Sequence, residues 1–190
     1  MMPDAEYSLS EKLAWAQWWA CAWKSAHEDW KGDQPASIDA LYQNRGSLPD
    51  GFMGVDDCLP PVPHPTVLRL ALASSEQLEL ALKLVNDTLS PQAAAGLDDS
   101  HHQWCIRLSK ALPPTVLASY TDPLQLLHSW LEPNAWQRLR LRFPRERACR
   151  IEQIPACLER ASSRLNTLWQ AVVWRVTSQT EDSITPESHV

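Results

Sequence analysis

The chain has 190 residues, of which 44% are hydrophobic and 21% are charged, the proportions of a globular protein with a sizeable core. Its net charge of −6 argues against nonspecific binding to nucleic acid or anionic lipid. The charge is uneven, because residues 1–103 hold 15 acidic and 6 basic side chains whereas residues 104–175 hold 5 and 11. The two parts can therefore dock on each other, or each can bind a partner of opposite charge.

The cysteines and the first residues of the chain predict a cytoplasmic protein. Five cysteines are an odd number and form no Cys-x-x-Cys pair, so neither a disulfide framework nor a zinc knuckle is expected. The first twelve residues lack the basic and apolar regions of a signal peptide. No apolar run approaches the roughly 18–20 residues of a membrane span, so direct membrane insertion is not expected.

A tryptophan-rich helix is predicted over residues 8–30. Ser8 and Glu11 have the spacing of a capping box, in which each side chain bonds the backbone of the other. After this start, tryptophans recur at steps of three and four residues on one stripe, at Trp15, Trp19, Trp23 and Trp30. A stripe this regular favours a core-facing role, and an aromatic face that anchors a partner is the alternative.

Residues 46–65 are rich in glycine and proline and are predicted to form a stiff connector. Residues 66–176 then carry successive apolar stripes at helical spacing, with a second capping box at Ser74 and Gln77. The longest stripe, from Leu158 to Val176, predicts the central helix. The polar residues 177–190 predict a disordered tail.

The hydrophobic periodicity of residues 138–143 fits both a strand and a helix. Their sequence Arg-Leu-Arg-Leu-Arg-Phe alternates as a half-buried strand would, yet Trp136, Leu139 and Phe143 fit a helix. Helix is preferred, because the chain has no second convincing strand to take up a strand's hydrogen bonds. The predicted fold class is therefore all-α, with one compact multi-helix domain over residues 1–176.

The sequence contains no phosphate-binding, dinucleotide-binding, nucleophile-elbow or zinc-protease motif. We therefore expect no enzymatic activity and no cofactor. His101, His102 and Cys105 lie within one helical turn, but a metal site there needs a fourth ligand such as Cys149 or Cys157. A solvated helix start with a buried thiol is preferred, so no catalytic or metal-binding residue is assigned.

An arginine cluster between Arg138 and Arg150 inverts the acidic charge of the chain locally. Three interpretations stay open: a solvated face, internal docking on the acidic first half, and a patch that binds an acidic protein partner. Nucleic acid is not favoured, because the cluster lacks glycine and interleaved exposed aromatic side chains. The candidate partner-binding residues are Arg138, Arg140, Arg142, Arg145, Arg147, Trp130 and Trp136.

Several leucine, tryptophan and arginine positions follow the pattern of one known family. They are Leu112-Pro113, Leu126-Leu127, Trp130, Trp136 and Arg138-Leu-Arg-Leu141. The stretch of residues 60–150 that contains them resembles the SctK family of bacterial type III secretion proteins, whose members include YscK, PscK and HrpD.

The resemblance implies a non-enzymatic, mostly helical protein of the cytoplasmic sorting platform, needed for protein secretion. Such a protein joins the cytoplasmic domain of the inner-membrane ring protein to the pod (C-ring-like) protein, and thereby to the stator and the ATPase. It is associated with the cytoplasmic face of the inner membrane through this apparatus. The alternative is an acidic type III secretion chaperone or a regulatory protein-binding protein.

Overall fold

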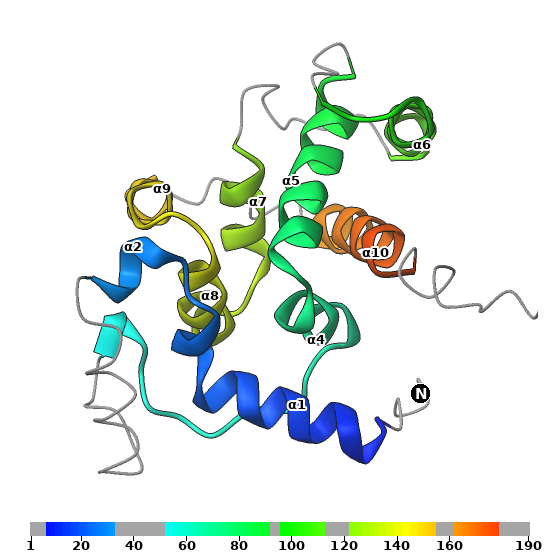
Figure 1. The fold of residues 1–190 in the computed structure, drawn as a ribbon. Coiled ribbons are helices and arrows are strands. Elements are labelled where there is room, and N and C mark those ends of the chain that lie inside the picture. The colour runs from blue at the N-terminus through cyan, green and yellow to red at the C-terminus, as the bar shows by residue number, and fades with distance from the viewer. Residues whose placement is uncertain (1–6, 33–51, 92–95, 113–121, 155–161, 179–190) are drawn as a thin grey trace, which may run out of the picture. The chain divides into compact units, whose positions relative to one another are not determined.

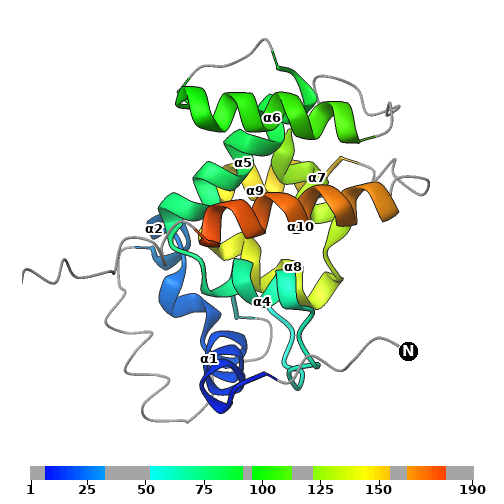
Figure 2. The same ribbon diagram turned by 90° about the vertical axis from the view of Figure 1, so that its right-hand side faces the viewer.

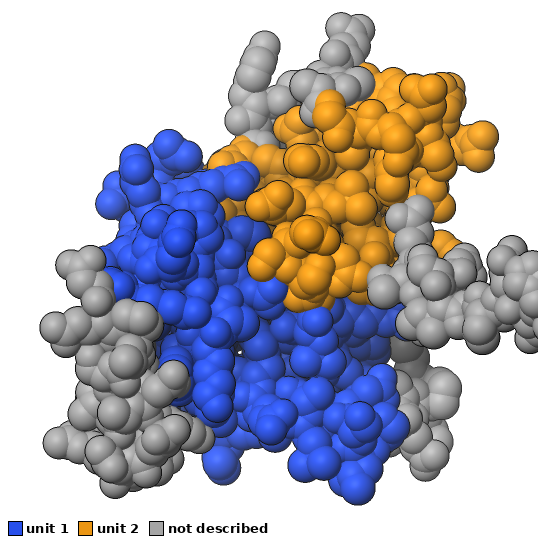
Figure 3. Space-filling model, in the orientation of Figure 1, with its two compact units in different colours: residues 1–72, 131–155 blue, residues 73–130, 156–190 orange. Residues whose placement is uncertain are grey.

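The computed structural model describes residues 7–32, 52–91, 96–112, 122–154 and 162–178 (Figures 1 and 2). Regular structure in these ranges is helical and includes no strand, which confirms the predicted all-α fold class. None of the helices in them combines the length and apolar character that a membrane span requires. The chain divides into two compact units, residues 1–72 with 131–155 and residues 73–130 with 156–190 (Figure 3). The single domain predicted over residues 1–176 stays a prediction.

Unit 1 begins with helix α1, Leu9–Ala20, which starts at the predicted capping box. The Ser8 hydroxyl accepts a hydrogen bond from the Glu11 N–H at 3.2 Å, and the Glu11 carboxylate accepts one from the Ser8 N–H at 2.9 Å. The core-facing interpretation of the tryptophan stripe is confirmed for Trp15, Trp19 and Trp23, which are buried. Trp18, outside the predicted stripe, is buried as well.

The prediction of one continuous helix over residues 8–30 is wrong, because the segment forms three short helices. They are α1, the 3-10 helix η1 (Ala22–Ser25) and α2 (Glu28–Lys31). Tertiary hydrogen bonds replace helical ones here: the His27 N–H donates to the Leu141 carbonyl at 2.6 Å, and the Trp30 indole donates to the Phe143 carbonyl at 2.9 Å. Long-range partners of this kind override a local helical period.

The proline-rich part of the predicted connector lies along α1 as a strap, residues 55–64, preceded by the 3-10 helix η2 (Phe52–Gly54). Three side chains donate hydrogen bonds to its carbonyls, Tyr7 to Pro63 at 2.7 Å, Trp15 to Pro61 at 2.9 Å and Trp19 to Cys58 at 2.8 Å. Because proline has no N–H, this segment cannot pair fully as a strand, and its carbonyls need donors from elsewhere. Residues 46–51 of the connector lie outside the described residues.

The remaining helices of unit 1 are α4 (Pro65–Leu72), α8 (Pro133–Leu139), η3 (Arg140–Arg142) and α9 (Arg145–Glu152). Helix α4 packs against α1. Residues 138–142 form the end of α8 and the turn of η3, so the preference for helix over strand is confirmed. Leu141 of this turn is buried in a cluster with Ala22 and Ala26.

The described helices of unit 2 are α5 (Ser75–Leu89), α6 (Asp99–Ala111), α7 (Pro123–Trp130) and α10 (Ser162–Ser178). Helix α5 packs against each of the other three, whereas the sequence predicts the last helix as the central one. Helices α6 and α10 appear end-on in Figure 1 and lengthwise in Figure 2, so both cross α5 in a similar direction.

The predicted start of α5 agrees with the structure, whereas the predicted end of α10 does not. The capping box at Ser74 and Gln77 starts α5 and is confirmed. Helix α10 continues to Ser178, past the predicted end at Val176, and residues 179–190 of the predicted tail lie outside the described residues. Trp174, which the periodicity adds to the core stripe, is 58% exposed.

Replacing Trp19 by phenylalanine tests the strap, because phenylalanine keeps an aromatic ring and lacks the indole N–H. We expect the variant to lose about 1–2 kcal/mol of unfolding free energy, since the Cys58 carbonyl loses its donor and a small cavity opens. Chemical denaturation followed by circular dichroism measures the change. The control Trp174→Phe, at an exposed position, should shift stability by less than about 0.5 kcal/mol. Equal losses in the two variants would contradict a stabilising role for the strap contact.

Candidate functional site

The arginine cluster lies on α8, η3 and α9 of unit 1, and its members differ in exposure. Arg138 on α8 is 3% exposed, and the Arg140 side chain on η3 is 12% exposed. Arg145, the first residue of α9, is exposed. A run of arginines in the sequence therefore does not form one surface in space.

Arg138 is a buried structural residue that connects three segments of unit 1. Its Nε donates to the Trp19 carbonyl at 2.9 Å, its Nη2 to the Asp56 carbonyl at 2.9 Å and its Nη1 to the Asn134 carbonyl at 3.0 Å. Its guanidinium carbon lies 4.0 Å from the centroid of the Trp19 ring, a cation–π contact. Burial lowers the pKa of Arg138, and no described carboxylate forms an ion pair with it. Arg138 therefore matches the internal-docking interpretation, and its role in binding a partner stays a prediction.

Arg140 connects η3 to α9 and to the turn before the strap. Its Nη1 donates to the two carboxylate oxygens of Glu152 at 2.7 and 2.9 Å, and the Trp136 indole donates to the same carboxylate at 2.9 Å. Its Nη2 donates to the carbonyls of Met53 and Gly54 at 2.9 and 3.0 Å. Both Nη groups and the positive charge of Arg140 are therefore engaged inside unit 1.

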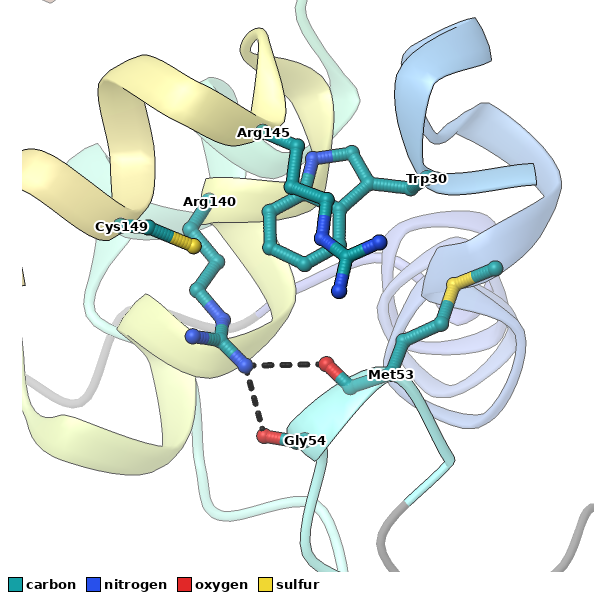
Figure 4. A pocket seen from close by; sticks show the side chains of 6 residues that line it. All are labelled: Trp30, Met53, Gly54, Arg140, Arg145 and Cys149. Atoms are coloured by element: carbon teal, nitrogen blue, oxygen red, sulfur yellow. Dashed lines mark hydrogen bonds between the residues drawn. The ribbon is translucent and has the colours of Figure 1, made fainter. Parts of the chain in front are cut away.

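The turn at residues 53–54 has the backbone conformation that this contact requires. Met53 has a φ of 55° and Gly54 a φ of 67°, so both lie in the left-handed region. A Cβ atom on Gly54 would clash with the Arg140 guanidinium. The turn directs two successive carbonyls at one nitrogen, as Figure 4 shows.

A cavity of about 320 Å³ lies beside this contact, and Figure 4 shows the side chains that surround it. The guanidinium carbons of Arg140 and Arg145 lie 5.2 and 5.5 Å from the centroid of the Trp30 ring. The cavity thus has a cationic and aromatic wall, and an anionic group with an apolar stem suits it. The residues that line it are Trp30, Met53, Gly54, Arg140, Arg145 and Cys149.

The other predicted partner-binding residues are spread over the two units. In unit 1, Arg142 and Arg147 are half-buried, and burial lowers the pKa of Arg142. Trp136 is buried. Trp130 belongs to unit 2, where it stacks on Trp169 with ring centroids 6.1 Å apart. The structure therefore brings only Arg140 and Arg145 of the seven to the cavity, and their role in binding stays a prediction.

The three potential metal ligands of α6 have separate local contacts. His101 Nδ1 lies 2.7 Å from the Asp98 carboxylate, and His102 Nδ1 lies 2.8 Å from the Asp87 carboxylate. The Cys105 side chain is buried. In the part of the chain that the structure describes, no three His, Cys, Asp or Glu side chains group closely enough to hold a metal ion.

The cavity is a feature that sequence reasoning misses. Tryptophan periodicity places Trp30 in a core stripe, and glycine and proline content places Gly54 in a connector, although both line the cavity with Arg140. The one local signal is the spacing of Arg145 and Cys149, four residues apart in α9, which puts them on the same helix face.

Comparisons of the chain with protein-family profiles, with curated proteins and with solved structures found no match. The resemblance to the SctK family therefore depends on the residues quoted for it above.

Lysine at position 138 keeps the charge but lacks the planar fork of donors that three carbonyls share. We expect Arg138→Lys to lose about 3 kcal/mol of unfolding free energy, because at least two buried hydrogen bonds are lost. Urea denaturation measures this. The control Arg150→Lys changes an exposed residue of α9 and should stay within about 0.5 kcal/mol of the parent. A loss below about 1 kcal/mol at position 138 would mean that the carbonyls find other donors.

The cysteines should differ in reactivity, because only the thiolate form is alkylated. The Cys105 thiol donates to the Leu84 carbonyl at 3.4 Å, and burial raises its pKa to about 11. Iodoacetamide at neutral pH should therefore modify half-buried Cys149 and leave Cys105 unmodified, as peptide mass spectrometry can quantify. Labelling in denaturant, where all thiols including Cys157 are accessible, is the control. Rapid labelling of Cys105 in the native protein would contradict its burial.

Proposed function

We propose that this chain is a non-enzymatic adaptor of a bacterial type III secretion system, with a role similar to that of the SctK family. In this role it connects the cytoplasmic domain of the inner-membrane ring protein to the pod protein, and through it to the stator and the ATPase. Its place is the cytoplasmic face of the inner membrane. The resemblance of residues 60–150 supports this assignment.

The observation that carries the proposal is that the described residues of the resemblance are mainly packing residues. Leu126 and Leu127 are 0% and 1% exposed in unit 2, and Trp136 and Leu141 are 3% and 1% exposed in unit 1. Arg138 donates hydrogen bonds to three backbone carbonyls. Residues in these roles maintain helix packing, which is what a helical scaffold that binds other proteins requires. They do not form the nucleophile–base arrangement of an enzyme site.

A secretion chaperone is the second candidate, and a specific surface favours it. Leu9 and Leu13 are 73% and 60% exposed and lie one turn apart on α1. An exposed apolar stripe of this kind can cover an apolar segment of an effector. A chaperone of this class is expected to be a dimer that holds its effector, whereas the adaptor need not be.

Binding assays with the partners from the same secretion system test the adaptor role. The immobilised protein should retain the ring protein's cytoplasmic domain or the pod protein, and deletion of its gene should stop secretion. An unrelated acidic helical protein of similar size is the control. Binding to neither partner, with secretion intact after deletion, would refute the adaptor proposal. A dimer in light scattering that copurifies with an effector would favour the chaperone instead.

A further inference from the structure

We infer that the cavity beside Trp30 receives the carboxylate side chain of an acidic segment on a protein partner, and that Arg145 binds this carboxylate. The identity of the partner rests on the proposed adaptor function. The chemistry of the ligand follows from the cavity itself, which belongs entirely to unit 1.

Arg145 is, among the described residues that line the cavity, the cation whose hydrogen-bond donors are unused. Among the described residues it makes no hydrogen bond or ion pair, and its contact is the cation–π contact with Trp30 at 5.5 Å. Arg140, in contrast, uses both of its Nη groups as donors: Nη1 donates to the Glu152 carboxylate, and Nη2 donates to two backbone carbonyls. The planar fork of one free guanidinium matches one carboxylate in a bidentate pair.

Trp30 gives this guanidinium a fixed surface on which to lie. Its indole N–H donates to the Phe143 carbonyl at 2.9 Å, which sets the orientation of the ring. The ring also packs against the buried cluster that contains Leu141. An arginine held against a fixed ring loses less side-chain entropy on binding than a free one, so the site is preorganised.

The rest of the cavity suits the apolar stem of an acidic residue and its apolar neighbours. Trp30, Met53 and Cys149 supply aromatic, thioether and thiol surface to the cavity. In Figure 4 the guanidinium of Arg145 lies beside Trp30, and the thiol of Cys149 lies beside Arg140. A volume of about 320 Å³ is at the lower end of the roughly 300–1,000 Å³ of ligand pockets. This size fits a few side chains of a peptide.

Charge complementarity favours a carboxylate on a protein over the phosphates of a nucleic acid. The Arg145 guanidinium lies 5.5 Å from the centroid of the Trp30 ring and has no ion pair among the described residues, so a carboxylate is attracted to this part of the cavity. With Arg138 and Arg140 engaged internally, the described residues that line the cavity offer one guanidinium without a hydrogen-bond partner, that of Arg145. A nucleic acid needs several phosphate contacts, and the net charge of −6 on the chain opposes it.

The test uses the full chain and the acetylated, amidated peptide Ser-Leu-Glu-Leu-Ser, with Ser-Leu-Gln-Leu-Ser as its uncharged match. Occupancy is measured as protection of Cys149 from iodoacetamide and as a shift of the Trp30 indole resonance, assigned with a Trp30→Phe variant. We expect the glutamate peptide at millimolar concentration to slow alkylation of Cys149 several-fold, and the glutamine peptide to leave it unchanged.

Substitutions on α9 then separate a specific site from a general effect of charge. Arg145→Gln should weaken binding of the glutamate peptide about tenfold, because a charge-assisted bidentate contact is lost. Arg150→Gln removes the same charge from an exposed position outside the cavity and should bind like the parent. Circular dichroism verifies the fold, and Arg145→Lys, which keeps the charge without the fork, should bind with intermediate strength.

Four results would overturn the site: equal effects of both peptides, no effect of either, undiminished binding by folded Arg145→Gln, or equal protection by inorganic phosphate or a DNA oligonucleotide. The proposed adaptor function and the proposed carboxylate site can be refuted independently of each other. If the ring and pod proteins do not bind but the glutamate peptide binds through Arg145, the site stands without that function. If those proteins bind the parent and Arg145→Gln equally and the peptide does not bind, the function stands without the site.

Discussion

Unit 1 depends on the buried guanidinium of Arg138 and the Trp19 ring against which it lies. The Trp19 carbonyl is among the last carbonyls of α1, which have no partner inside the helix, and Arg138 supplies the missing donor. The same side chain binds carbonyls of the strap and of α8. Carbonyl dipoles and a ring face thus take the place of a counter-ion, which makes the buried charge tolerable.

The same principle extends through unit 1, where side-chain N–H groups replace secondary-structure hydrogen bonds. The indoles of Trp15 and Trp19 donate to the strap, and the guanidinium of Arg140 donates to the turn before it. Proline-rich backbone has more acceptors than donors, so tryptophan and arginine donors complement it. This requirement explains why the two residue types are abundant in segments that are distant in sequence and adjacent in unit 1.

Local features were predictable from the sequence and long-range ones were not. The capping boxes at Ser8 and Ser74, the all-α class and the helical state of residues 138–142 follow from patterns within a few residues. The break after α1 and the burial of Arg138 depend on contacts between residues more than 80 positions apart. Periodicity assigns a side chain to a helix face, but it cannot say which distant carbonyl that side chain meets.

The charge asymmetry of the sequence shows why proximity along the chain is a poor guide to a binding surface. Unit 1 combines residues 1–72 with residues 131–155 and so holds 13 acidic and 11 basic side chains, a near balance that neither segment has alone. Within it, Arg138 and Arg140 satisfy backbone and carboxylate acceptors, whereas Arg145 starts a new helix and stays exposed. An arginine can serve recognition only where its donors remain unused, because a partner must otherwise break contacts that hold the fold. The residue to examine in such a cluster is therefore one whose donors remain unused among the described residues and whose guanidinium lies at a cavity, as that of Arg145 does.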